Sequence, residues 1–371
     1  MSYQVLARKW RPQTFQQMVG QTHVLRALIT ALQESRLHHA YLFTGTRGVG
    51  KTTVARIFAK CLNCETGVTA EPCGTCRSCV EIAEGRHVDL IEVDAASRTK
   101  VEDTRELLDN VQYAPTRGRY KIYLIDEVHM LSGHSFNALL KTLEEPPPHV
   151  KFLFATTDPQ KLPVTILSRC LQFNLKRMAL DLISGHLSSV LTEEQIEFTP
   201  TALKLLARAA DGSMRDALSL TDQVIVTGGG AINDETVQDM LGLMPAEYLM
   251  KLVHALLEHN AIELMATVEQ MAQLTTDFAT ATESLISLLH QLAVSQFVPS
   301  EDPDIQALAE AVSAADLQLY YQLALHARRD LPLNPDPRSG FEMLLLRMLA
   351  FKLDDTKNLV EVTKKKNPDN T

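Results

Sequence analysis

Gly45-Thr46-Arg47-Gly48-Val49-Gly50-Lys51-Thr52 is the stretch of sequence that decides the fold. It matches the pattern G-x-x-x-x-G-K-[ST], in which backbone N–H groups cradle phosphates, the lysine reaches the outer phosphates and the hydroxyl binds Mg²⁺. An apolar run at residues 40–43 precedes it and a helical pattern at residues 53–60 follows it, as the motif requires. The sequence therefore predicts a strand, a phosphate-binding loop made of all eight residues, and a helix whose N-terminus binds ATP or GTP.

The composition is that of a folded chain with more than one domain. It has 371 residues, of which 45% are hydrophobic, and a formal net charge of −9. No stretch approaches the roughly 20 apolar residues that cross a bilayer, and the polar N-terminus lacks the apolar core of a signal peptide. We expect a cytoplasmic protein with no membrane partner. The negative total argues against a uniformly basic coat for nucleic acid, although a local basic surface can still bind phosphates.

Short apolar runs of the kind that form buried strands alternate with helical segments in the first half of the chain. They lie at residues 41–44, 88–93, 120–125, 151–155 and 171–173. This alternation predicts an α/β fold with a parallel sheet covered by helices. After residue 176 the pattern becomes helical, first at 202–210 and 214–226, then throughout the region beyond Pro245, where an apolar stripe runs from Leu249 to Leu257.

A pair of carboxylates directly follows the strand predicted at residues 120–125. Asp126 comes first and is placed to hold Mg²⁺ together with Thr52, while Glu127 is placed to orient and deprotonate an attacking water. Alone, such a pair is typical of a solvated turn. Next to the phosphate-binding loop, it predicts hydrolysis of the nucleotide in addition to its binding.

Five of the six cysteines fall between residues 61 and 79, which indicates a metal site in an insertion at about residues 61–80. Cys64, Cys73, Cys76 and Cys79 offer four sulfur ligands, the set that structural Zn²⁺ prefers. Cys61 also forms a C-x₂-C pair with Cys64, but it continues the apolar face of the preceding helix and is predicted to be a core residue. With no open ligand position, the predicted zinc is structural.

Two further basic features are open to more than one interpretation. Arg169 precedes the last predicted strand, where an arginine is usually solvated but could also stabilise charge on a transferring phosphate. Arg98 and Lys100 stand near a predicted helix start, which suits the DNA backbone as well as it suits plain solvation.

The chain resembles the gamma/tau subunit family of the bacterial DNA polymerase III clamp loader, which are AAA+ ATPases. The motifs that carry the resemblance occur in order along most of the chain. Besides the phosphate-binding loop and the cysteines, they are Ala7-Arg8-Lys9-Trp10-Arg11-Pro12, Asp126-Glu127-Val128-His129, Ala155-Thr156-Thr157, Ser168-Arg169-Cys170 and Gly212-Ser213-Met214-Arg215-Asp216-Ala217.

The resemblance implies roles for residues that spacing alone does not assign. Thr157 is similar to a sensor of the γ-phosphate, Arg169 to an arginine finger presented to the next subunit, and Arg215 to a second sensor in a helical lid. Lys51, Asp126 and Glu127 complete the catalytic set. Arg98 and Lys100 would follow the DNA backbone inside a spiral of ATPase domains.

The resemblance also implies the domain organisation. It places an AAA+ ATPase domain at residues 1–178, a helical lid at 179–243 and an all-helical collar that oligomerises at 244–360. The polar residues 361–371 are predicted to be a disordered tail. The implied cofactors are ATP, Mg²⁺ and structural Zn²⁺. The implied partners are other clamp-loader subunits, copies of this chain, the sliding clamp and primer–template DNA.

Two other functions fit parts of the sequence. A translocating AAA+ motor such as a branch-migration helicase would need the same loop and carboxylates, but not the cysteine insertion or the segment 8–12. A structural ring subunit that binds nucleotide without hydrolysing it would not need Glu127 and Arg169. We therefore expect an ATP-driven clamp-loader subunit.

Overall fold

The structure is a computed structural model that describes residues 4–97, 110–274, 277–300 and 302–351. The chain divides into two compact units, Met1–Val237 and Gln238–Thr371. The predicted DNA contacts Arg98 and Lys100 and the predicted tail at 361–371 lie outside the described residues.

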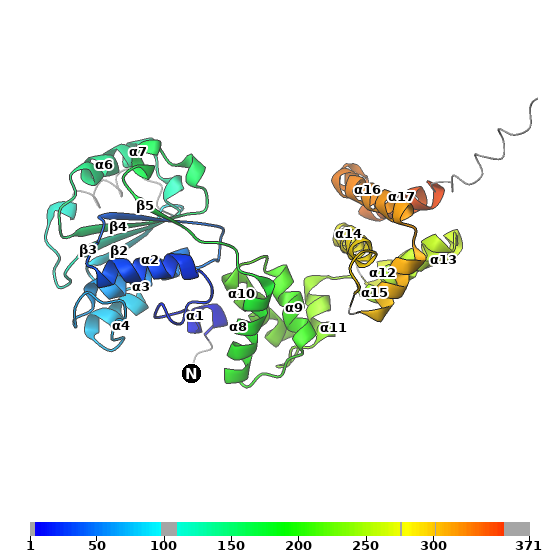
Figure 1. The fold of residues 1–371 in the computed structure, drawn as a ribbon, viewed down its shortest axis with the longest axis horizontal. Helices are drawn as coiled ribbons and strands as arrows, with labels where there is room; N and C mark the ends of the chain where they lie inside the picture. Colours follow the sequence, from blue (N-terminus) through cyan, green and yellow to red (C-terminus); the bar gives the residue numbers. More distant parts are fainter. Residues whose placement is uncertain (1–3, 98–109, 275–276, 301, 352–371) are drawn as a thin grey trace, which may run out of the picture. The chain divides into compact units, whose positions relative to one another are not determined.

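A parallel sheet forms the centre of the first unit, as the sequence predicts. Within the described residues it has five strands in the order β2-β3-β4-β1-β5 (Figure 1). The strands are β1 (Ala40–Thr44), β2 (Leu90–Asp94), β3 (Lys121–Asp126), β4 (Val150–Thr156) and β5 (Leu171–Asn174). β2 starts later than predicted because the chain turns just before it, where the backbone N–H of Leu90 donates to the carbonyl of His87. The carboxylate of Asp89 in this turn holds the loop that leads into β3.

Helices cover both faces of the sheet, which is why its strands read as continuous apolar runs. Figure 1 shows α2 (Thr22–Gln33), α3 (Lys51–Asn63) and α4 (Arg77–Glu84) on one face, and α6 (Gly133–Glu144) and α7 (Val164–Leu167) on the other. Alternate residues of β1 enter different cores: Tyr41 packs against Phe58 of α3, whereas Leu42 belongs to the same core as Leu139 of α6. Every residue of β1 is buried.

Short helical elements connect the strands, and a helical region completes the first unit. α1 (Leu6–Lys9) precedes the first strand, and the connecting elements are η1 (Asn110–Gln112), η2 (Val128–Met130) and η3 (Pro159–Lys161). The helical region comprises α8 (Leu180–Glu193), α9 (Pro200–Ala209) and α10 (Met214–Thr227), followed by α11 (Asp234–Leu241). Thr199 and Ser213 cap α9 and α10 by accepting hydrogen bonds from backbone N–H groups of the first turns.

The second unit is helical throughout its described residues. Its elements are α12 (Ala246–Leu257), α13 (Ala261–Leu274), α14 (Phe278–Ser295), α15 (Pro303–Ala311), α16 (Ala314–Asp330), η4 (Leu331–Leu333) and α17 (Pro337–Ala350). The predicted stripe on α12 enters the core, where Leu249, Leu252, Val253 and Leu256 are buried. In the part of the chain that is described, no single helix is long and apolar enough to cross a membrane; α11 and α12 meet that criterion jointly, across a bend of 75°.

Candidate functional site

The carboxyl ends of β1, β3 and β4 bring most of the predicted nucleotide site together. Because neighbouring strands are parallel, the loop after β1, Asp126 at the end of β3 and Thr157 after β4 lie along one edge of the sheet. Lys51, only 6% exposed, donates hydrogen bonds from Nζ to the carbonyl oxygens of Gly45 and Thr46, at 2.9 and 3.0 Å. Burial lowers the pKa of Lys51, against the opposing effect of the nearby carboxylates. The lysine therefore lies against the inside of its own loop, where a phosphate would give it a stronger partner.

The lid region contacts the phosphate-binding loop at Gly48. The backbone N–H of Arg215, in the first turn of α10, donates to the carbonyl of Gly48 at 3.4 Å. Gly48 has φ +76°, and a Cβ there would lie 1.8 Å from Oγ of Ser213. Only glycine allows this close approach. Gly48 therefore also permits the contact between the phosphate-binding loop and Arg215, the predicted second sensor.

The predicted magnesium ligands are already paired with each other. Oγ1 of Thr52 donates to Oδ2 of Asp126 at 2.7 Å. Glu127 follows in the left-handed backbone region, with φ +46°, and its Oε2 accepts hydrogen bonds from the backbone N–H and the hydroxyl of Thr157, at 3.1 and 2.9 Å. Thus the sequence-predicted Thr52, Asp126, Glu127 and Thr157 form one connected polar group beside the loop.

Arg169 lies away from this group, at the opposite edge of the sheet. It precedes β5, which pairs with β1 in parallel register, so the finger lies near the start of β1 and the phosphate loop follows its end. The length of β1 alone is about 15 Å. Nη1 of Arg169 donates to the carbonyl of Thr165 at 2.7 Å, and Nη2 pairs with Glu144 at 2.8 Å. Arg169 therefore lies at the amino end of the parallel strands, away from the phosphate-binding loop of its own chain.

Arg11 is a residue of the site to which the sequence analysis gave no role. Its Nε donates to Oγ1 of Thr53, in the first turn of α3, at 3.2 Å. Burial lowers the pKa of Arg11 to about 10, and repulsion from Arg56 and Arg215 acts in the same direction, against nearby carboxylates. Arg11 is therefore a partly buried cation beside the first turn of α3, the helix that follows the phosphate loop. Arg11 belongs to one of the motifs that carry the family resemblance, so the sequence did single out its segment. Nothing in the sequence indicated that Arg11 contacts Thr53.

The residues present fit a nucleotide with its magnesium ion. The loop offers backbone N–H groups at the N-terminus of α3, Lys51 is held by two carbonyl groups, and the Thr52 and Asp126 oxygens are of the type that Mg²⁺ binds. These features suit a phosphate chain and a hard cation.

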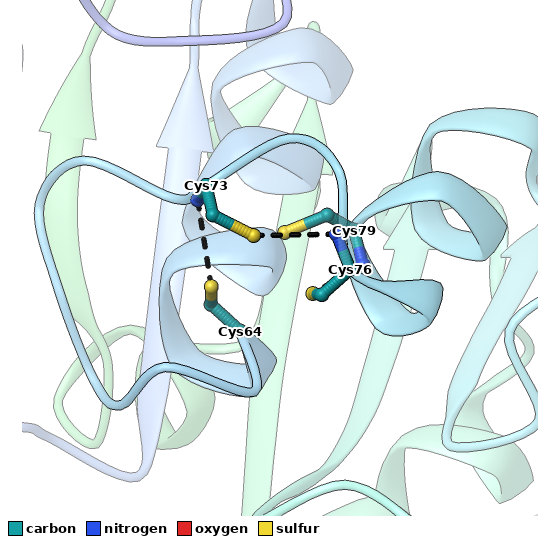
Figure 2. A group of neighbouring side chains, drawn as sticks. All are labelled: Cys64, Cys73, Cys76 and Cys79. Atoms are coloured by element: carbon teal, nitrogen blue, oxygen red, sulfur yellow. Dashed lines mark hydrogen bonds between the residues drawn. The ribbon is translucent and has the colours of Figure 1, made fainter.

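The four predicted zinc ligands also lie together (Figure 2). The sulfur atoms of Cys64, Cys73, Cys76 and Cys79 are all within 4.8 Å of one another, close to the spacing of about 3.8 Å that tetrahedral Zn–S bonds of 2.3 Å impose. Cys61 lies outside this group, as predicted: it belongs to α3 and is fully buried in the core, and burial raises its pKa to about 12.

Backbone N–H groups point at the sulfur atoms. The N–H groups of Cys73, Cys76 and Cys79 donate to the sulfurs of Cys64, Cys73 and Cys76, at 3.5, 3.3 and 3.4 Å. Hydrogen bonds from backbone N–H groups, that of Cys76 first, lower the pKa of Cys73 to about 6. Such bonds favour the thiolate, which is the form that binds a metal.

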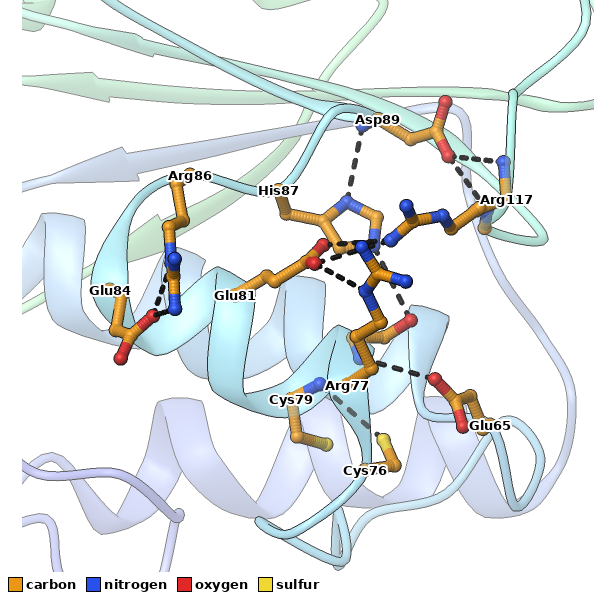
Figure 3. A network of polar contacts seen from close by, with 12 residues as sticks. Glu65, Cys76, Arg77, Cys79, Glu81, Glu84, Arg86, His87, Asp89 and Arg117 are labelled. Atoms are coloured by element: carbon orange, nitrogen blue, oxygen red, sulfur yellow. Dashed lines mark hydrogen bonds and ion pairs between the residues drawn. The ribbon is translucent and has the colours of Figure 1, made fainter.

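A polar network joins the cysteine insertion to the sheet (Figure 3). Glu81 of α4 pairs with Arg77 at 2.7 Å and with Arg117 at 3.2 Å. Nearby, the buried carboxylate of Asp89 accepts three backbone hydrogen bonds of 2.6 to 2.8 Å from the loop 116–118. Burial alone would raise the pKa of Asp89, but these hydrogen bonds outweigh it and the net pKa is lowered. The insertion is therefore anchored beside β2 and β3 by contacts that do not involve a metal.

Three family models match the chain in succession. Residues 20–179 match "DNA polymerase III, delta subunit", residues 182–230 match "DNA polymerase III clamp loader subunit, ATPase lid domain", and residues 232–362 match "DNA polymerase III subunits gamma and tau domain III". The domain boundaries expected from the sequence, at 178 and 243, stay predictions.

Solved structures resemble the chain more weakly. The Holliday junction branch migration motor RuvB of Thermotoga maritima is 21% identical, with a TM-score of 0.47, over 67% of this chain and 80% of that one. The Bacillus subtilis DNA clamp loader delta protein is 12% identical, with a TM-score of 0.36, over 88% of this chain and 100% of that one. These similarities are too low to support a conclusion.

Curated relatives are much more similar. The DNA polymerase III subunit tau of Escherichia coli is 59% identical over 95% of this chain, which spans 56% of that protein. The DNA polymerase III subunit gamma of Buchnera aphidicola subsp. Baizongia pistaciae is 45% identical over 94% of this chain and 97% of its own length. Because that relative is covered almost from end to end, the chain belongs to the gamma/tau subunit family of DNA polymerase III.

Proposed function

We propose that the chain is the ATP-driven motor subunit of a replicative clamp loader. It would assemble with other clamp-loader subunits, including copies of itself, to open a sliding clamp and place it on primer–template DNA in the cytoplasm. The single observation that carries this proposal is the connected group of Thr52, Asp126, Glu127 and Thr157 beside the phosphate loop, in a chain of the gamma/tau family.

In this proposal the catalytic work is divided between two subunits. Lys51 and the loop N–H groups bind the phosphates, Thr52 and Asp126 hold Mg²⁺, Glu127 takes the proton of the attacking water, and Thr157 and Arg215 report the state of the nucleotide. When bound, Mg²⁺ neutralises negative charge on the phosphates. The adjoining subunit contributes Arg169. ATP then favours the clamp-holding state only as far as it binds that state more tightly.

We include DNA among the partners because of the family to which the chain belongs and because Arg98 and Lys100 are predicted to contact the DNA backbone. Their role as backbone contacts stays a prediction, because they lie outside the described residues. Cations at such a position would contribute to DNA affinity without reading its sequence.

The steady-state ATPase rate, measured with and without clamp, primed DNA and partner subunits, tests the proposed function. We expect the assembled complex to be stimulated most when clamp and primed DNA are both present, because each binds the ATP state preferentially. A translocating motor would respond to DNA without the clamp, and a structural subunit would show no turnover. Either result would contradict the proposal.

We also propose that Cys64, Cys73, Cys76 and Cys79 hold a structural Zn²⁺. Four thiolates leave no position open for a substrate or a catalytic water. The ion would crosslink the insertion between α3 and α4, which the network around Glu81 and Asp89 then joins to the sheet.

Cys76→Ser is expected to abolish equimolar zinc binding and to lower the free energy of unfolding of the first unit by several kcal/mol, since zinc binding to such sites contributes about 10 to 16 kcal/mol in peptides. Metal analysis and thermal unfolding of protein purified without chelator measure both effects. Cys61→Ala is the matched control, because Cys61 also fits a C-x₂-C pair but lies in the core, and it should keep its zinc. If wild-type protein holds no zinc, or if Cys61→Ala loses it, the assigned ligand set is wrong.

A further inference from the structure

One oxygen of the Glu127 carboxylate carries all of its observed contacts. Thr157 donates two hydrogen bonds to Oε2, and Nδ1 of His129 lies 3.4 Å from the same atom. Within the residues that the structure describes, Oε1 accepts no hydrogen bond from the protein. Glu127 is thus anchored through Oε2, and Oε1 is left for the attacking water that the proposed function assigns to this residue.

The two anchors of Oε2 differ in what a nucleotide would do to them. A threonine hydroxyl has one proton to donate. If the hydroxyl of Thr157 turns to the γ-phosphate, as its proposed sensor role requires, its hydroxyl bond to Glu127 is lost, and Oε2 keeps the backbone N–H of Thr157 and the contact with His129. His129 is not in the proposed nucleotide contacts, so its hold on Oε2 does not compete with the substrate.

His129 is itself firmly placed. It belongs to the short helix η2, its side chain is 9% exposed, and its Nδ1 lies 2.8 Å from Oγ1 of Thr156. Thr156 is fully buried at the end of β4, and its Oγ1 also accepts a hydrogen bond of 3.1 Å from the backbone N–H of Asp158. The imidazole is therefore tied to the strand next to the one that ends in the catalytic carboxylates.

The contacts indicate which ring nitrogen carries the proton. An ionised carboxylate oxygen only accepts hydrogen bonds, so an unprotonated Nδ1 facing Oε2 would bring two lone pairs together. With the proton on Nδ1, the ring donates its one hydrogen bond to Oγ1 of Thr156 at 2.8 Å, and Oε2 of Glu127, 3.4 Å from Nδ1, faces the positive end of the same N–H group. The tautomer is inferred from this network.

We propose that His129 is a positioning residue for hydrolysis, which holds Oε2 of Glu127 so that Oε1 faces the attacking water. This inference rests on the proposed ATPase function. It assigns no chemistry to the imidazole: the proton of the water goes to Glu127, and His129 acts only by orienting that carboxylate.

The test replaces the imidazole of His129 by the amide side chains of asparagine and glutamine. Each amide presents an N–H donor near only one of the two ring-nitrogen positions. Asparagine can place its amide nitrogen near the position of Nδ1, whereas glutamine reaches the position of Nε2. We expect kcat of the assembled complex, stimulated by clamp and primed DNA, to fall about tenfold in His129→Ala and His129→Gln, a part of the 10²–10⁴ that a general base contributes. His129→Asn should stay within about threefold of wild type, and KM for ATP should change little in all three.

A second substitution tests the same network from the other side. Thr156→Val removes the hydroxyl that fixes the ring while keeping the side-chain shape, and it should lower kcat to a similar extent. Combined with His129→Ala it should add little further loss, because both changes remove one anchoring chain.

Each result has a definite meaning. Equal losses in His129→Asn, His129→Gln and His129→Ala, a loss that resides in KM, or additive losses with Thr156→Val would overturn the inference. A wild-type assembly that clamp and DNA do not stimulate would refute the proposed function instead. Normal wild-type activity together with an unchanged kcat in His129→Ala would refute the positioning role alone.

Discussion

Glu127→Gln should lower the rate of ATP hydrolysis by about 10²- to 10⁴-fold while leaving ATP binding nearly unchanged. The amide keeps the size of the side chain and can still meet Thr157, but it cannot take a proton from water. Lys51, Thr52 and Asp126, which contact the phosphates and the metal in our account, are untouched. Single-turnover hydrolysis by the assembled complex, with nucleotide binding measured in parallel, separates the two effects.

Glu193→Gln provides the matched control for this substitution. Glu193 is an exposed residue at the end of α8. The substitution Glu193→Gln removes the same negative charge, but away from the nucleotide site. The assembled complex that carries Glu193→Gln should hydrolyse ATP at the wild-type rate. A Glu127→Gln complex within about threefold of wild type would show that another group activates the water, since a lost general base costs far more.

Arg169→Ala should produce the other large effect, a loss of about 10³-fold or more in the assembled complex. The reason is geometric as well as chemical. Arg169 lies at the amino end of β5, whereas the phosphate loop follows the carboxyl end of β1, so the guanidinium is on the wrong edge of the sheet to reach its own nucleotide. The loss should therefore appear in the assembly and be nearly absent from the slow turnover of the isolated chain.

Arg177→Ala is a suitable control for the loss of an arginine. Arg177 is a half-exposed residue that forms an ion pair with Asp211, away from the sheet edge that carries Arg169. Its removal should change turnover little, because exposed ion pairs contribute only about 0–1 kcal/mol. Equal losses in both variants would mean that general positive charge, not the finger, supports hydrolysis.

Much of the first unit could be predicted because its physical causes are local. A strand buried on both faces is apolar along most of its length, so the runs that become β1, β3 and β4 are visible in the sequence. Polar residues directly after such runs fall at one edge of a parallel sheet, which is why Asp126 could be assigned to the site, whereas the role of Thr157 was implied only by the family resemblance. The cysteine spacing is similarly local, and the structure brings together the same four sulfur atoms.

The remaining features depend on contacts between distant positions. Arg11 reaches Thr53, and His129 reaches Thr156, across intervals that no short motif records. The start of β2 was predicted too early because the chain turns at residues 87–90, and the carboxylate of Asp89 in this turn bonds to a loop more than twenty residues away. In each case the role of a polar side chain depends on a contact with a residue that is distant in the sequence. Only the folded structure brings the two residues together.

The measurement that tests the central claim most directly is complementation between two inactive variants. In an assembly of Lys51→Ala chains, Arg169 is intact but the nucleotide sites are not. In an assembly of Arg169→Ala chains, the nucleotide sites are intact but Arg169 is missing. If each site is completed by the adjoining subunit, complexes assembled from a mixture of the two should regain clamp- and DNA-stimulated ATPase activity well above either alone. A mixture that stays as inactive as its components would contradict the account.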